Sequence, residues 1–117
     1  MRRSDAESVA IDCLLSWTTG DFATTRSLVH DTMIFVGPLA TVHGGDEYVA
    51  GLAPLSAIVT EVKTRVTFVE GDDVCIIYDL VTNTPAGTIP TVGWYQIKQG
   101  KVSSLRVFFD PRPLVQA

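Results

Sequence analysis

The sequence Trp17-Thr18-Thr19-Gly20-Asp21-Phe22 ends one predicted helix and begins another. Upstream of it, a capping box formed by Ser4 and Glu7 starts a helical repeat of apolar residues. The repeat consists of Ala6, Val9, Ala10, Cys13, Leu14 and Trp17. Gly20 suits the C-cap of this helix, and Asp21 suits the N-cap of a second, short helix that runs to about residue 29. The stretch therefore predicts two helices joined by a tight turn.

The chain after the second helix contains short strands and one further helix. Residues 32–36 are β-prone and end at Gly37-Pro38, and residues 41–43 predict a brief second strand. Gly44-Gly45-Asp46 begins a third helix, and we expect Pro54 to kink or close that helix near its end. This segment therefore adds one helix and two strands to the fold.

From residue 58 onward, the pattern is that of strands linked by hairpins. A half-buried strand is predicted where apolar and polar residues alternate, with one face carrying Val62, Thr64, Val66 and Phe68. Turns then separate three further strands, at 74–82, 88–97 and 102–110. Three helices followed by four such strands predict an α+β fold that forms one domain over residues 1–117. In that fold the helices lie on one face of an antiparallel sheet.

Composition restricts the partners of this domain. Nine Lys and Arg against thirteen Asp and Glu give a net charge of −4, without the basic patch that nucleic-acid binding requires. No apolar run approaches the roughly 20 residues that span a bilayer, and Ser4 and Asp5 stand where a signal peptide is apolar. Cys13 and Cys75 show no metal-site spacing and are expected to be reduced thiols. We therefore expect a cytoplasmic protein with no cofactor, no metal, no nucleic acid and no membrane partner.

Four short motifs occur in an order typical of one superfamily. They are Gly20-Asp21-Phe22, Leu28-Val29-His30-Asp31, Val42-His43-Gly44 and Gly100-Lys101-Val102. Over about residues 5–110 the sequence resembles the nuclear transport factor 2-like superfamily, of cystatin-like fold, which contains ketosteroid isomerases, SnoaL-like polyketide cyclases and limonene epoxide hydrolase. The resemblance implies a cone-shaped, curved antiparallel sheet wrapped around three N-terminal helices, with a mostly apolar pocket inside the cone.

The resemblance does not extend to the catalytic residues of ketosteroid isomerases. Alignment of the shared motifs places Cys13 and Gly93 at the two hydrogen-bond donor positions and Gly37 at the position of the base. Since a thiol is a poor donor and glycine has no side chain, we do not expect that reaction. The Arg-x-Asp of limonene epoxide hydrolase is also absent near residues 92–94. If the domain is an enzyme, we expect a cofactor-independent isomerase, cyclase or hydrolase.

Two residues are candidates for proton transfer. Asp110 ends the last strand, where cyclase-like members carry an acid–base aspartate; alternation directs it outward unless a bulge or Pro111 turns it toward the pocket. The alternative is a solvated carboxylate, or one paired with Arg106 or Arg112. His43 precedes the third helix and carries the side chain that most often acts as a general base. Its alternative is an exposed loop position.

Strand alternation separates residues that face the pocket from residues that face outward. Six aromatic residues are predicted to bind a small hydrophobic ligand: Trp17, Phe35, Tyr48, Tyr78, Tyr95 and Phe109. The alternative is core packing for Trp17 and Tyr48, and hydrogen bonding to the backbone for Tyr78 and Tyr95. Apolar residues remain on the outer face of the sheet, which predicts a homodimer there unless helices or the tail cover it. They include Ile77, Val92, Trp94 and Phe108.

Two functions stay open at this level. One is a small SnoaL-like enzyme that acts on a hydrophobic carbonyl compound or a polyketide-like molecule. In that case Asp110 or His43 transfers the proton, and Tyr78 or Tyr95 orients the substrate. The other is a non-catalytic module that binds an apolar ligand or serves dimerisation.

Overall fold

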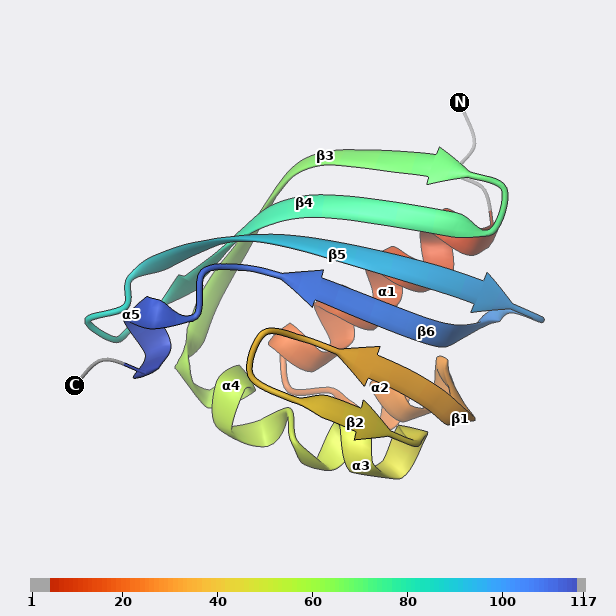
Figure 1. Ribbon diagram of the computed structural model, residues 1–117, viewed down its shortest axis with the longest axis horizontal. Helices are drawn as coiled ribbons and strands as arrows, with labels where there is room; N and C mark the ends of the chain where they lie inside the picture. Colours follow the sequence, from red (N-terminus) through yellow and green to blue (C-terminus); the bar gives the residue numbers. More distant parts are fainter. Residues whose placement is uncertain (1–4, 116–117) are drawn as a thin grey trace.

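The computed structural model describes residues 5–115, in which a curved sheet of six strands wraps around helix α1 (Figure 1). Ser4, the predicted helix cap, lies outside the described residues. The elements follow one another as α1 (Asp5–Thr18), α2 (Phe22–Ser27), β1 (Val29–Val36), β2 (Thr41–His43), α3 (Gly45–Ala50), α4 (Ala53–Ile58), β3 (Val59–Glu70), β4 (Asp73–Thr82), β5 (Thr88–Lys98), β6 (Lys101–Phe108) and α5 (Arg112–Val115). The predicted α+β class and the curved sheet are thereby confirmed. Within the described residues, no helix is both long and apolar enough to cross a membrane.

The strands are ordered β2-β1-β6-β5-β4-β3 across the sheet. All neighbouring pairs are antiparallel except β1 and β6, which run parallel. The prediction of an antiparallel sheet therefore holds for every neighbouring pair except this one. Hairpins produce antiparallel neighbours, whereas β1 and β6 are joined only through the intervening helices and strands, and such a long crossover permits parallel pairing.

The core lies between α1 and the concave face of the sheet. Cys13, Leu14 and Trp17 of α1 are buried, as their helical spacing predicts. Gly20 has a φ of +85°, which lets the chain turn sharply after α1. The Asp21 carboxylate then accepts a hydrogen bond from the backbone N–H of Thr24 and caps α2. The opening sequence therefore forms the predicted two-helix junction.

The predicted third helix is two short helices, α3 and α4. The chain leaves α3 at Gly51, and Pro54 lies in the first turn of α4 rather than at the end of a helix. Proline is well accommodated in a first turn because its missing N–H has no helical partner there. The terminal segment also forms α5, which the sequence analysis did not predict. Both differences matter for the site, because Leu55 of α4 and Leu114 of α5 line the cavity described below.

A bulge in β3 changes which residues face the core. The register with β4 shifts between Thr64 and Val66, so Arg65 is an extra residue. One extra residue reverses the alternation, because successive side chains point to opposite faces. Val62 packs against the core, whereas Val66 and Phe68 are exposed on the outer face. The prediction that all four alternating residues share one face was therefore wrong.

Candidate ligand-binding cavity

A small cavity of about 80 Å³ lies inside the cone. It is lined by all six aromatic residues that were predicted to face the pocket, namely Trp17, Phe35, Tyr48, Tyr78, Tyr95 and Phe109. The remaining lining consists of Thr91 and aliphatic residues, namely Leu52, Leu55, Leu80, Ile89, Leu105, Val107 and Leu114. The structure thus brings the predicted aromatic residues to one place, and their role in binding stays a prediction.

Different elements position the aromatic side chains. Trp17 comes from the last turns of α1, Tyr48 from α3, Tyr78 from β4 and Tyr95 from β5. The ring of Tyr48 packs against that of Phe35 on β1, with 5.4 Å between the ring centroids and 37° between the planes. Five of the six rings are therefore held by helices or strands, which favours a preformed cavity, and Phe109 follows directly after β6.

Three tyrosines line the cavity, and their side chains are almost wholly buried, whereas no unpaired polar side-chain atom among the described residues is itself fully buried. Burial raises the pKa of Tyr78 above its ordinary value and raises the pKa values of Tyr48 and Tyr95 well above theirs. Among residues 5–115, no group forms a hydrogen bond with any of these hydroxyls. The cavity therefore offers neutral, protonated phenols whose donors are unused within the protein. Such groups suit a ligand that carries a hydrogen-bond acceptor.

Gly93 makes room for the ring of Tyr95, which lies two residues along β5 on the same face. A Cβ at position 93 would lie 3.0 Å from Cε1 and 3.6 Å from the hydroxyl oxygen of Tyr95. The phenol thus occupies the space that a side chain at position 93 would enter. Cys13 is also buried here, and burial raises the pKa of its thiol to about 12. The thiol is therefore protonated and unreactive at neutral pH.

The two residues predicted for proton transfer lie outside the cavity lining. The Asp110 carboxylate accepts hydrogen bonds from the side chain and backbone N–H of Arg112, including one of 2.6 Å from Nη2. These hydrogen bonds lower the pKa of Asp110 to about 2. His43 is exposed on β2. The structure therefore favours the alternative stated for each residue: an ion-paired carboxylate for Asp110 and an exposed position for His43.

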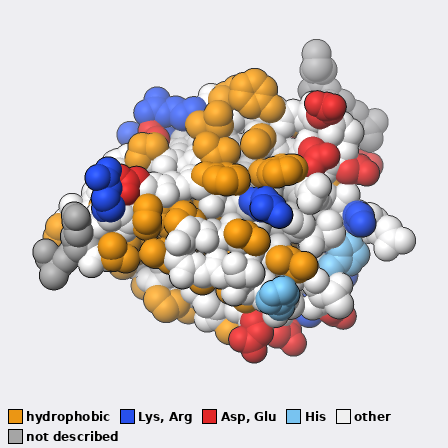
Figure 2. Space-filling view, viewed as in Figure 1, with side chains coloured by type: hydrophobic (Ala, Val, Ile, Leu, Met, Phe, Trp, Pro, Cys, Tyr) orange, Lys and Arg blue, Asp and Glu red, His pale blue; other side chains and the backbone are white. Residues whose placement is uncertain are grey.

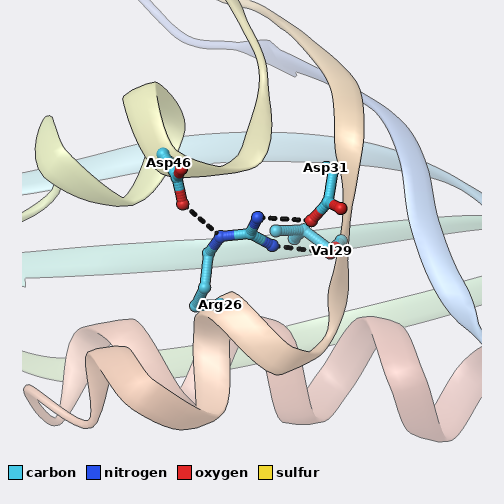
Figure 3. Close-up of polar contacts among 4 residues, drawn as sticks. All are labelled: Arg26, Val29, Asp31 and Asp46. Atoms are coloured by element: carbon cyan, nitrogen blue, oxygen red, sulfur yellow. Dashed lines mark hydrogen bonds and ion pairs between the residues drawn. The ribbon is translucent and has the colours of Figure 1, made fainter.

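Arg26 connects the elements that carry Tyr48. Its guanidinium donates to the Asp46 carboxylate at 2.7 Å, to Asp31 at 2.5 Å and to the backbone oxygen of Val29 at 3.2 Å (Figure 3). The clamp joins α2 and β1 to the first turn of α3, and Tyr48 follows two residues after Asp46. Gly45 permits this close approach, since a Cβ there would lie 2.8 Å from Nη1 of Arg26. Arg26 holds these elements together, a role that sequence reasoning missed because none of its three partners is adjacent to it in the chain.

The sequence matches the SnoaL-like domain family over residues 13–105, which is well over half of the chain. The chain belongs to this family. No curated protein matches the sequence significantly. The match and the fold together place this SnoaL-like domain in the nuclear transport factor 2-like superfamily.

Several solved structures share the fold of this SnoaL-like domain. A protein from Kribbella flavida is 24% identical with a TM-score of 0.90, and the match covers 97% of this chain and 93% of that one. A nuclear transport factor 2-like protein of unknown function from Cytophaga hutchinsonii is 27% identical with a TM-score of 0.80, covering 99% and 98%. An LEH-like epoxide hydrolase from M. tuberculosis is 20% identical with a TM-score of 0.77, covering 91% and 83%. Likeness to the first and third of these shows the shared fold alone.

Proposed function

We propose that this SnoaL-like domain binds a small, largely apolar molecule through one hydrogen-bond acceptor, such as a carbonyl oxygen, and does not itself transfer a proton. The main support for this proposal is the set of side chains that line the cavity. None of the described residues that line it has a carboxylate, imidazole, ammonium or guanidinium group, whereas three lining residues are tyrosines with protonated hydroxyls. An apolar cavity with a few converging polar groups is the usual form of a small-molecule site.

Proton transfer next to a carbonyl requires a base, and the cavity does not supply one. The raised pKa values of Tyr48, Tyr78 and Tyr95 keep these phenols protonated at neutral pH. They can donate to a carbonyl oxygen but cannot accept a proton from carbon. The lowered pKa of Asp110 makes it a weak base, and its ion pair with Arg112 holds it away from the lining. These observations support the binding function over the enzymatic one.

Binding can be tested with acetophenone and with ethylbenzene, which has a similar shape but no acceptor. Trp17 lines the cavity and Trp94 lies on the outer face, so the two indole N–H resonances report on the two places separately. The variant Trp94→Phe assigns the resonances. We expect acetophenone to shift the Trp17 resonance with a Kd about 2- to 12-fold lower than that of ethylbenzene, the range that one neutral hydrogen bond provides. Equal affinity for both compounds, or a shift of Trp94 alone, would refute the proposal.

We also propose that the outer face of the sheet binds a second copy of this domain. Two cross-strand rows cover it: Val66, Ile77, Val92 and Phe108 form one, and Phe68, Cys75, Trp94 and Arg106 form the other. Phe68 is 59% exposed and Phe108 is 54% exposed. Hydrophobic side chains gather over the middle of the sheet in the face that Figure 2 shows. The described helices lie on or beside the opposite face and leave these rows uncovered (Figure 1).

A second copy suits this face because the two rows run side by side across four neighbouring strands. A twofold axis through the sheet therefore brings apolar rows of both copies together. The guanidinium of Arg106, 5.9 Å from the ring centroid of Trp94, is the charged group in the rows. Sedimentation of the protein at micromolar concentration tests this proposal. We expect a dimer that Phe68→Glu converts to a monomer, while Leu15→Glu on α1 leaves it dimeric; a monomeric parent protein would contradict it.

A further inference from the structure

An apolar groove continues the cavity to the surface. It has a volume of about 440 Å³ and runs past the turn formed by residues 37–40, α4 and α5. The groove and the cavity share six lining residues, namely Phe35, Tyr48, Leu52, Leu55, Phe109 and Leu114. The shared residues form the mouth of the cavity. A molecule that enters the cavity therefore passes along the groove.

The two compartments differ in chemistry. Tyr48, Tyr78 and Tyr95 supply donors to the cavity, whereas Tyr48, at the mouth, is the groove's one lining residue with a polar side chain among those described. Leu39 lies on the groove and is 54% exposed. Residues at the tips of surface turns are usually polar. Leu39, beside Pro38, instead exposes apolar surface that the fold does not cover.

The two compartments also differ in size. The cavity, at about 80 Å³, is smaller than the roughly 150 Å³ cavity that admits a benzene ring in an engineered protein. Only a compact group with a few heavy atoms, such as the acetyl group of acetophenone, fits inside it, and an aromatic ring lies at the mouth. A ligand large enough to bind well must therefore extend through the mouth into the groove.

We infer that the ligand is elongated, with a compact head that carries one carbonyl-type acceptor and a hydrocarbon chain that lies in the groove. This inference rests on the proposed binding function and specifies the class of ligand. The head accepts hydrogen bonds from the buried tyrosines, and the chain contacts Leu39, Leu55 and Leu114. A peptide is disfavoured as the occupant, because its backbone N–H and C=O groups would meet apolar side chains without hydrogen-bond partners.

A series of linear methyl ketones tests the inference: 2-butanone, 2-hexanone, 2-octanone and 2-decanone. The measurement is the Kd of each ketone from the shift of the Trp17 indole resonance. Full burial of one methylene lowers Kd about fourfold, and a groove open on one side provides about half of that free energy, or about twofold. We expect Kd to fall about twofold for each added methylene and to level off when the chain fills the groove. Equal Kd values for all four ketones would overturn the inference and leave the proposed function intact.

Matched variants locate the chain. Leu39→Ser removes an apolar contact from the groove, and Leu15→Ser removes another exposed leucine from α1 (44% exposed against 54% for Leu39), away from the groove lining. Leu39→Ser is expected to weaken 2-decanone severalfold and to leave 2-butanone unchanged, whereas Leu15→Ser changes neither. Equal effects of the two variants would overturn the placement of the chain. If octane binds as tightly as 2-octanone, the protein does not recognise the acceptor, and the proposed function is wrong. If no ketone shifts the Trp17 indole resonance, both the proposed function and this inference are wrong.

Discussion

Replacement of Tyr78 by phenylalanine removes one hydroxyl and leaves the ring in place. Tyr78 is 3% exposed, and its hydroxyl forms no hydrogen bond with the described residues. Loss of a hydrogen-bonded hydroxyl costs about 1 kcal/mol, but this hydroxyl has no protein bond to lose. Full burial of an unpaired hydroxyl costs about 1–3 kcal/mol. No described side-chain polar atom is fully buried without a partner, so the Tyr78 hydroxyl is accessible and the net effect lies at the low end of that range. We therefore expect Tyr78→Phe to be unchanged in stability or more stable by up to about 1 kcal/mol.

Thr25 provides the matched control, because it is also buried but its hydroxyl is paired. The Thr25 Oγ1 lies 2.6 Å from Oγ of Ser16 and donates to the backbone oxygen of Asp21 at 3.1 Å. Thr25→Val keeps the shape of the side chain and removes both bonds. We expect this variant to lose about 1–3 kcal/mol. The two replacements of a hydroxyl thus have opposite or clearly different effects.

Urea denaturation measures the free energy of unfolding of each variant. If the dependence of that free energy on urea concentration has the same slope in both variants, their unfolding midpoints can be compared directly. The same Tyr78→Phe protein is then titrated with acetophenone and ethylbenzene. Its Kd for acetophenone is expected to rise about 2- to 12-fold with that for ethylbenzene unchanged. The reasoning is refuted if Tyr78→Phe loses as much stability as Thr25→Val, since its hydroxyl is then paired within the protein and not available to a ligand.

Two further predictions concern the residues that shape the cavity. Gly93→Ala places a methyl group 3.0 Å from the Tyr95 ring, and we expect it to lower the free energy of unfolding, measured by heat or urea, by about 1–3 kcal/mol. The control Gly51→Ala, whose nearest atom would be 3.6 Å away, is expected to leave that free energy unchanged. Equal effects of the two variants would contradict the packing argument. Arg26→Gln is expected to lower the urea midpoint at pH 7. Because hydrogen bonds from Arg26 lower the pKa of Asp31 below its ordinary 3.8, this difference should shrink as pH falls below about 3.8, and a difference that grows in acid would contradict the role of the ion pair.

Local patterns in the sequence predict most of the fold, because the chemistry of neighbouring residues determines where helices and strands form and which of their faces is buried. The helical spacing of Cys13, Leu14 and Trp17 predicts the buried face of α1, and alternation on β4 and β5 places Tyr78 and Tyr95 in the interior. The bulge at Arg65 was not predictable, because a single inserted residue leaves an alternating pattern looking continuous. Parallel pairing of β1 with β6 was not predictable either, since it depends on contacts between the two ends of the chain.

The site was predictable to a similar degree. Six aromatic residues were predicted to face the pocket. Thr91 could have been added, because it lies four residues before Tyr95 on β5 and therefore on the same face of the sheet. Leu114 had no such signal, since it comes from a short terminal helix after a proline. The assignment of proton transfer to Asp110 relied on a resemblance that did not include the local pairing with Arg112. The two residues are close in the chain, and their pairing was stated from the sequence as the alternative role of Asp110.

The place of Gly93 explains how this fold keeps hydrogen-bond donors in an apolar cavity without the acids of ketosteroid isomerases. The resemblance assigns a donor to position 93, and here that residue has no side chain. Its absence leaves the volume that the Tyr95 ring occupies, two residues further along the same face of β5. A donor therefore remains beside the position where the family has one, but it is a phenol with a raised pKa instead of a carboxyl group. The base has no such replacement, because Gly37 lies in the turn after β1 and its neighbour in space is the Phe35 ring. A cavity that keeps donors and lacks a base can hold a carbonyl compound without enolising it.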